Sequence, residues 1–144
     1  MTAATAPTIS EAPAATSGHA LTRTLPRTTV LVGLGAAVVV TALAAAADVA
    51  GVPLAIDGEV IPIAGFAQMT FVGAVIGGVM IALLNRFSAA PRRRFVQTAI
   101  ALTTLSCVPS VMLPPDTATR VVLVATHVVA AAIIVPVLAR YAHD

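Results

Sequence analysis

Charged residues are scarce in this chain, at 10% of its 144 residues. A soluble domain of ordinary composition carries about 25%. This deficit and a hydrophobic content of 58% exclude an ordinary water-soluble domain and indicate a membrane protein. The sequence has no basic stripe interleaved with aromatic residues, which argues against nucleic acid as a partner.

Cysteine, tryptophan and lysine are also scarce or absent. Cys107 is the single cysteine, so the chain can form neither an internal disulfide nor a C-x-x-C redox pair. Tryptophan is absent and tyrosine occurs once, so the aromatic belts common at membrane interfaces are nearly missing. All eight basic residues are arginine. No catalytic, nucleotide-binding or metal-binding motif stands out, and the sequence therefore predicts no catalytic residue, metal or cofactor.

Four long apolar runs predict transmembrane helices. Each approaches or exceeds the ~20 residues that cross a ~30 Å hydrocarbon core, and a single span satisfies its own backbone hydrogen bonds only as a helix. Short loops make consecutive spans antiparallel neighbours. The expected fold class is all-α: an integral membrane antiparallel four-helix bundle, with a short outer loop or hairpin between the first two helices. The spans are expected at about 29–50, 63–84, 95–113 and 121–139.

The chain divides into a tail, a bundle and a short end. Residues 1–27 are rich in Ala, Thr, Ser and Pro without periodicity, which predicts a disordered cytoplasmic tail. Residues 28–140 form the expected transmembrane domain, and 141–144 a short cytoplasmic C-terminus. The first span has a second interpretation, a signal peptide cleaved after 45–47. Its apolar stretch exceeds the ~7–15 residues usual in signal peptides, so we expect the span to be retained.

Arginine placement predicts the orientation. Seven of the eight arginines lie before span one, between spans two and three, or after span four. Only Arg120 lies in the other loops. Because cytoplasmic loops carry the excess of positive charge, both termini are expected in the cytoplasm of a multi-pass cell-membrane protein. Arg92, Arg93 and Arg94 are the main topology anchors, and their position implies attraction to anionic headgroups of the lipid bilayer.

Two outer loops carry local signals. Asp57-Gly58 stands between short apolar runs in the loop 51–62, which predicts a hairpin. An isolated hairpin is marginal in water, so this one would rest on the mouth of the bundle. In the second outer loop, Asp116 or Thr117 is expected to cap the last helix.

Small residues recur at helical spacing in the first two spans. Small residues four apart let helix backbones approach closely in a membrane. We expect them to serve contacts within the bundle, with a homo-oligomer interface as the alternative. The residues are Gly33 and Ala37 in the first span and Gly73, Gly77 and Gly78 in the second.

Polar side chains within the spans form a candidate cluster toward the outer half of the bundle: Asp48, Gln68, Ser106, Ser110 and His127. Such groups tend to face the bundle interior, because burying them in lipid is costly. His127 is expected to point toward the Ser106/Ser110 stripe and toward Asp48. It would either hold helix register or handle protons or a ligand. The hydroxyls of the stripe are expected to bond back to the preceding turn.

Two short segments resemble a known group of proteins. Residues 105–109 (LSCVP) and 126–131 (THVVAA), with a helix end that contains Pro136, resemble a family of small four-span actinobacterial membrane proteins of unknown function. The resemblance covers residues 28–140. It implies a four-helix fold and singles out Ser106, Pro109 and His127, and it implies no activity.

Three functions compete at this point. Small-residue stripes and the lack of catalytic motifs favour an accessory or scaffold protein that contacts another membrane protein or a second copy of itself. A small transporter-like or proton-coupled protein using His127 and Asp48 is the first alternative, although the first span lacks a central carboxylate. A membrane-embedded enzyme is the second, but His127 lacks the further His, Glu or Cys ligands of a metal or haem centre.

Overall fold

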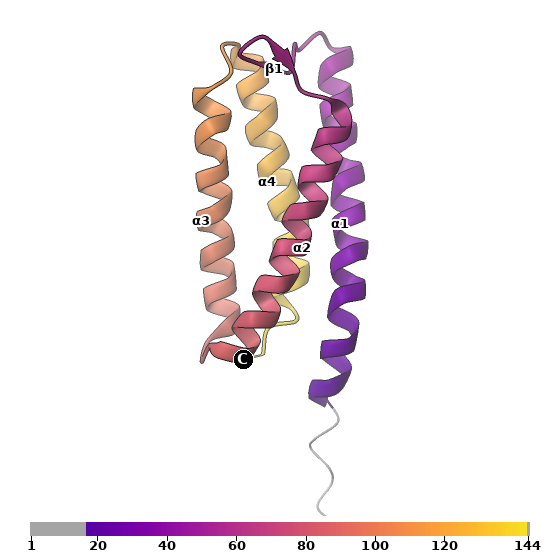
Figure 1. The fold of residues 1–144 in the computed structure, drawn as a ribbon, viewed down its shortest axis with the longest axis vertical. Helices are drawn as coiled ribbons and strands as arrows, with labels where there is room; N and C mark the ends of the chain where they lie inside the picture. The colour runs from indigo at the N-terminus through magenta and orange to yellow at the C-terminus, as the bar shows by residue number, and fades with distance from the viewer. Residues whose placement is uncertain (1–16, 144) are drawn as a thin grey trace, which may run out of the picture.

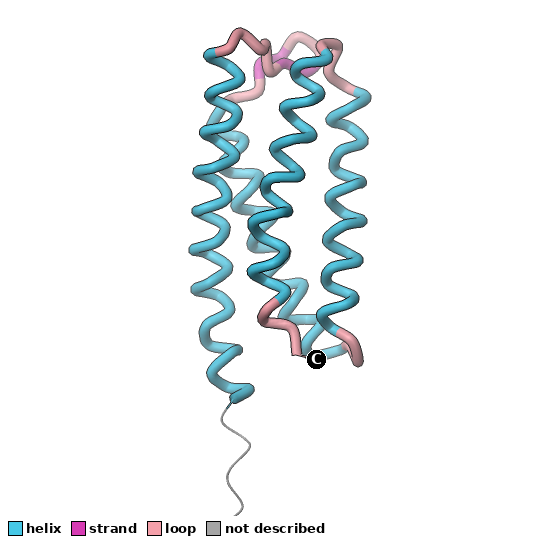
Figure 2. Tube along the Cα trace, turned by 180° about the vertical axis from the view of Figure 1, so that it is seen from behind, coloured by secondary structure: helices cyan, strands magenta, loops and turns pink. Residues whose placement is uncertain are grey.

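The computed structural model describes residues 17–143, with side chains from Thr24 onward. Its four helices are α1 (Ser17–Val49), α2 (Ile63–Phe87), α3 (Pro91–Met112) and α4 (Thr117–Ala139). They run antiparallel in chain order, as Figures 1 and 2 show from opposite sides. Each helix is long and apolar enough to cross a membrane. The prediction of four such helices is therefore confirmed.

The helix of the first span begins earlier than predicted. Residues 17–27, placed in the tail by composition, belong to α1, whereas residues 1–16 lie outside the described part of the chain. Leu25 is buried in one cluster with Leu138 of α4. The hydroxyl of Thr28 lies 2.7 Å from that of Tyr141. Contacts with the distant end of the chain thus stabilise turns that the local sequence does not favour.

Glycines bring α1 and α2 into close contact. A Cβ atom at Gly33 would lie 2.9 Å from the Cβ of Ala74, and one at Gly78 would lie 2.6 Å from both branches of the Thr29 side chain. Ala37 is buried as well. Small residues at Gly33 and Gly78 are thus required for contacts within the chain.

The buried core has two parts, and α1 contributes to both. One part includes Ala36 of α1, Ile81 and Phe95; the other includes Val40 of α1 and Phe66. Cleavage of the first span would remove one wall of each. Its retention stays a prediction, supported by this shared core.

The predicted hairpin is present at one end of the bundle, here called the hairpin end (Figure 1). Strands β1 (Ala55–Ile56) and β2 (Glu59–Val60) pair antiparallel. Asp57 and Gly58 have φ values of 52° and 82°, and two positive values are what a type I′ turn requires. Leu54 is 1% exposed and lies in a buried cluster with Phe66 of α2. The hairpin therefore closes this end of the bundle.

The opposite end, here called the terminal end, holds the start of α1 and the last described residues (Figure 1). The Asn85 side chain donates to the carbonyl of Tyr141 at 2.8 Å and accepts from the backbone N–H of His143 at 3.1 Å. Together with the pair formed by Thr28 and Tyr141, these bonds join α1, α2 and the segment after α4.

The start of α4 follows the predicted capping pattern. The Asp116 carboxylate accepts from the Thr119 backbone N–H at 2.8 Å and from its hydroxyl at 3.1 Å. The backbone bond from Thr119 is the main reason that the pKa of the Asp116 carboxyl lies below its usual range. Asp116, one of the two predicted candidates, is therefore the N-cap.

Candidate functional site

A cavity of about 630 Å³ lies among the four helices. This volume falls within the ~300–1,000 Å³ typical of small-molecule sites. Every helix contributes to its wall: Val40 from α1, Phe66 from α2, Phe95 from α3 and Leu123 from α4. These four side chains are buried, so the back of the cavity is closed by the core.

The cavity opens sideways between α2 and α3. Met69 and Ile76 of α2 are 64% and 56% exposed, and Leu102 of α3 is 46% exposed, although all three line the cavity. Gly73 also lines it, and a Cβ there would meet no atom within 4 Å. Gly73 therefore departs from the expected helix contact, because no neighbouring helix packs against it and the missing side chain widens the cavity.

Gly77, one turn further along α2, does make the expected close contact. A Cβ there would lie 3.0 Å from Cδ1 of Leu138 in α4, so this position has little room for a side chain. Gly73 and Gly77 thus share a helix face, yet one opens the cavity and the other packs against α4.

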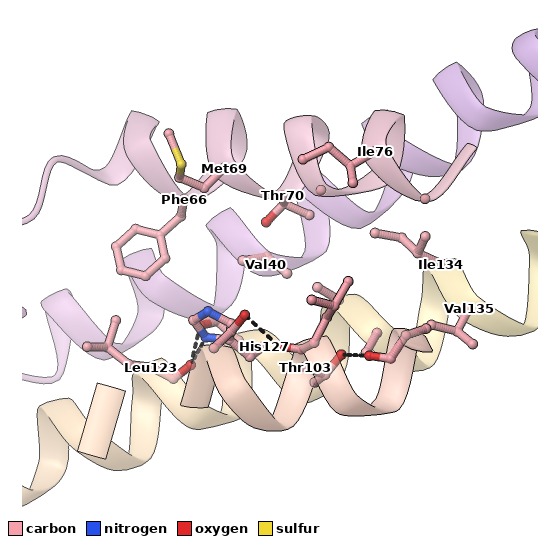
Figure 3. Close-up of a pocket in the computed structure, with 18 of the residues that line it drawn as sticks. Val40, Phe66, Met69, Thr70, Ile76, Thr103, Leu123, His127, Ile134 and Val135 are labelled. Carbon is pink, nitrogen blue, oxygen red and sulfur yellow. Dashed lines mark hydrogen bonds between the residues drawn. The ribbon is translucent and has the colours of Figure 1, made fainter. Parts of the chain in front are cut away.

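Five polar side chains line an otherwise apolar surface: Thr70, Thr103, Ser106, Thr126 and His127. Figure 3 shows Phe66 and Thr70 of α2 on one side, and His127 and Thr103 on the other. His127 is the eleventh of the 23 residues of α4, roughly 15 Å from the start of the helix. Because α4 begins four residues before the predicted span, His127 lies close to mid-helix, just within the half of α4 that begins at the hairpin end.

Three of the four hydroxyl groups in this lining donate their proton within their own helix. Thr103, Ser106 and Thr126 each donate to a carbonyl three or four residues earlier in the same helix, at 2.7 to 2.8 Å. The predicted back-bonding of the Ser/Thr stripe is thus confirmed. These hydroxyls keep their lone pairs and present only acceptors to the cavity.

The His127 ring has a defined proton position. Nδ1 lies 2.7 Å from the carbonyl oxygen of Leu123. A carbonyl can only accept, so Nδ1 carries the proton, and in the neutral ring Nε2 is then an acceptor. Thr126 donates to the same carbonyl oxygen, so the two side chains share one acceptor. Among residues 24–143, Nε2 has no hydrogen-bond partner.

The structure brings together two of the five residues in the candidate cluster. Ser106 and His127 line the cavity. Ser110 is buried and donates to the Ser106 carbonyl at 3.2 Å, outside the cavity lining. Asp48 and Gln68 are exposed. The expected bond from His127 to another helix is not formed, because its donor is used by Leu123 in its own helix.

Sequence reasoning missed two lining residues, Thr70 and Thr126. Thr70 lies four residues after Phe66 and three before Gly73, so it shares their face of α2; that spacing was the available signal. Thr126 directly precedes His127, and the adjacent polar pair was its signal. Within the described residues, no group of three or more His, Cys, Asp or Glu side chains could hold a metal ion.

Comparison with known proteins identifies the family of the chain. No curated protein and no solved structure matches it. Residues 20–144 match a family described as DUF6069, of unknown function, and this range includes every residue that lines the cavity. An actinobacterial origin stays a prediction from the resemblance noted in the sequence. With most of its length covered by the match, the chain belongs to DUF6069, a protein family of unknown function.

Proposed function

We propose that this chain is a multi-pass cell-membrane protein that binds a hydrophobic small molecule within the bilayer. The observation that carries the proposal is the cavity of about 630 Å³ with its mouth between α2 and α3. The mouth is flanked by exposed apolar side chains of both helices. With the helices inserted, this mouth faces lipid chains, so a ligand dissolved in the hydrocarbon enters without crossing the headgroup layer.

Charge distribution supports the insertion and its direction. Arg86, Arg92–Arg94 and Arg140 lie at helix ends on the terminal end of the bundle, where α1 also starts with Arg23 and Arg27 in its first turns. Only Arg120 lies at the hairpin end. Positive residues accumulate on the cytoplasmic side, which supports a cytoplasmic location of both termini.

An accessory role through helix contacts is the second candidate. The glycines that favoured it, Gly33, Gly77 and Gly78, meet partners inside the chain, which weakens the argument from sequence. What remains in its favour is the apolar opening between α2 and α3, which could receive side chains of a partner helix. A proton-coupled role for His127 with Asp48 has less support, because Asp48 is exposed and the two are not joined.

Tryptophan fluorescence tests binding in the cavity directly. The chain has no tryptophan, so Met69→Trp supplies a single reporter at the mouth. In lipid nanodiscs, 1-bromododecane should quench this reporter in a saturable manner. Adding Gly73→Leu should abolish the saturable part, because the new side chain fills the cavity without meeting an atom at its Cβ.

The matched control is Gly35→Leu. A Cβ atom at Gly35 would also meet no atom within 4 Å, but Gly35 does not line the cavity. It should leave saturable quenching unchanged. Quenching that rises linearly with bromododecane and is identical in all variants would reflect partition into lipid alone and would refute the proposal.

A further inference from the structure

The polar groups that line the cavity offer more free hydrogen-bond acceptors than free donors. Three of its five polar side chains donate their only proton to their own helix. The fourth, His127, donates from Nδ1 and leaves Nε2 as an acceptor. Thr70 alone retains a donor, because its hydroxyl has no partner among the described residues. It lies across the cavity from His127 (Figure 3).

The excess of free acceptors over donors determines which functional group of a ligand the cavity can pair with. A carboxylate offers only acceptors and would meet mostly acceptors. An ether or alkane would leave Nε2 unpaired in an apolar site, which is unfavourable. A hydroxyl group donates one proton and accepts others, so it can donate to Nε2 of His127 and accept from Thr70.

We infer that the cavity binds a hydrophobic alcohol, a single apolar chain or compact apolar body that carries one hydroxyl group. The hydroxyl lies between His127 and Thr70, and the apolar part lies along Phe66, Phe95 and Ile134. The cavity volume of about 630 Å³ favours one chain over a two-chain lipid. This inference rests on the proposed function, and it adds the class of ligand.

Nitrogen-15 NMR of the wild-type protein tests the contact without any substitution. With ¹⁵N-labelled histidine, the neutral form of the His127 ring should carry its proton on Nδ1 and none on Nε2; a His127→Asn sample identifies its signals. Dodecanol should shift the Nε2 resonance, because Nε2 then accepts a hydrogen bond. The methyl ether of dodecanol, with the same chain and no donor, should leave it in place. A neutral ring whose single proton lies on Nε2 in the free protein would overturn the inference.

Affinity gives an independent measurement. In the Met69→Trp reporter, 12-bromododecanol should bind about five- to tenfold more tightly than its methyl ether, the difference expected of one net hydrogen bond. His127→Leu should bring the two affinities together by weakening the alcohol alone. Equal affinities in the protein that keeps His127, with saturable binding of both, would overturn the alcohol assignment and leave the proposed function intact.

Two further outcomes separate the possible failures. If neither compound quenches the reporter saturably, the proposed function fails together with the inference. Competition by unlabelled dioctanoylglycerol as strong as competition by dodecanol would show that a two-chain lipid occupies the cavity, which overturns the single-chain assignment. Weaker competition by the glyceride supports it.

Discussion

At the scale of single residues, a glycine in this bundle acquires its role from the helix opposite it. Gly78 faces Thr29 across the α1–α2 contact, whereas Gly73 and Gly35 face open space. In the sequence, nothing in the pattern of small residues distinguishes these three glycines from one another. Only the position of the neighbouring helix distinguishes a contact from a cavity wall.

Gly78→Ala should destabilise the bundle. The added Cβ would lie 2.6 Å from both Oγ1 and Cγ2 of Thr29, so rotating that side chain exchanges one clash for the other. Overpacking of this kind costs about 1–3 kcal/mol, which exceeds the ~1 kcal/mol gained from replacing a helical glycine. Thermal unfolding in detergent should show a lower Tm for this variant.

Gly35→Ala is the matched control, because its Cβ meets nothing within 4 Å. It should raise the Tm slightly through helix propensity alone. If Gly78→Ala raised the Tm as much as Gly35→Ala does, the close approach of α1 and α2 at Thr29 would be disproved.

Residue-level prediction from the sequence succeeded where the signal is local. Asp116 caps the helix that begins at the next residue, and the Ser/Thr stripe bonds to the preceding turn, because both depend only on neighbours in the chain. The partner of His127 was not predictable in this way. An imidazole can bond within its own helix or across to another helix, and the spacing of residues along the chain does not distinguish the two.

At the scale of elements, the hairpin connects α1 to α2 and also closes one end of the bundle. Leu54 precedes β1 with φ at 41°, a conformation unfavourable for a residue with a branched side chain. The strained backbone is offset by burial, since the Leu54 side chain is 1% exposed in the cluster with Val40 and Phe66. The Ile61 backbone N–H donates to the Leu54 carbonyl at 2.8 Å.

Leu54→Ala should therefore loosen the hairpin end. Removing a buried leucine side chain costs about 2–5 kcal/mol, so thermal stability should fall and the Ile61 amide should exchange with deuterium faster. Val60→Ala is the control, because Val60 is 70% exposed and its truncation should change the free energy of unfolding by less than about 0.5 kcal/mol. Equal effects of the two substitutions would show that the hairpin does not close the bundle.

The elements themselves were mostly predictable, and the exception is instructive. Long apolar runs and the Asp57-Gly58 pair specify their structures over a few neighbouring residues. The first turns of α1 do not, because Pro26 and the polar residues around it favour a loop by composition. Their helix depends on Leu25 and Thr28 meeting residues at and beyond the end of α4, which lie at the other end of the chain.

At the scale of the whole molecule, the arginine distribution makes the orientation testable. A periplasmic-active reporter such as alkaline phosphatase fused after Gly58 should be active, and one fused after Ala90 should be inactive, because seven of eight arginines lie at the terminal end. A cytoplasm-active reporter should give the reverse pattern. Phosphatase activity at Ala90 would contradict the proposed orientation.

The hydrogen bonds of the middle of the bundle have a mechanical consequence. Thr103, Thr104, Ser106, Thr126 and His127 all bond to carbonyls of the helix that carries them. The bonds that join Asn85, Thr28 and the segment after α4 lie at the terminal end instead. Moving α3 away from α2 at mid-height therefore breaks none of these bonds. Within the described residues, apolar contacts such as that of Phe95 with the Ile81 cluster therefore hold α3 beside α2, and hydrogen bonds between helices do not contribute at mid-height.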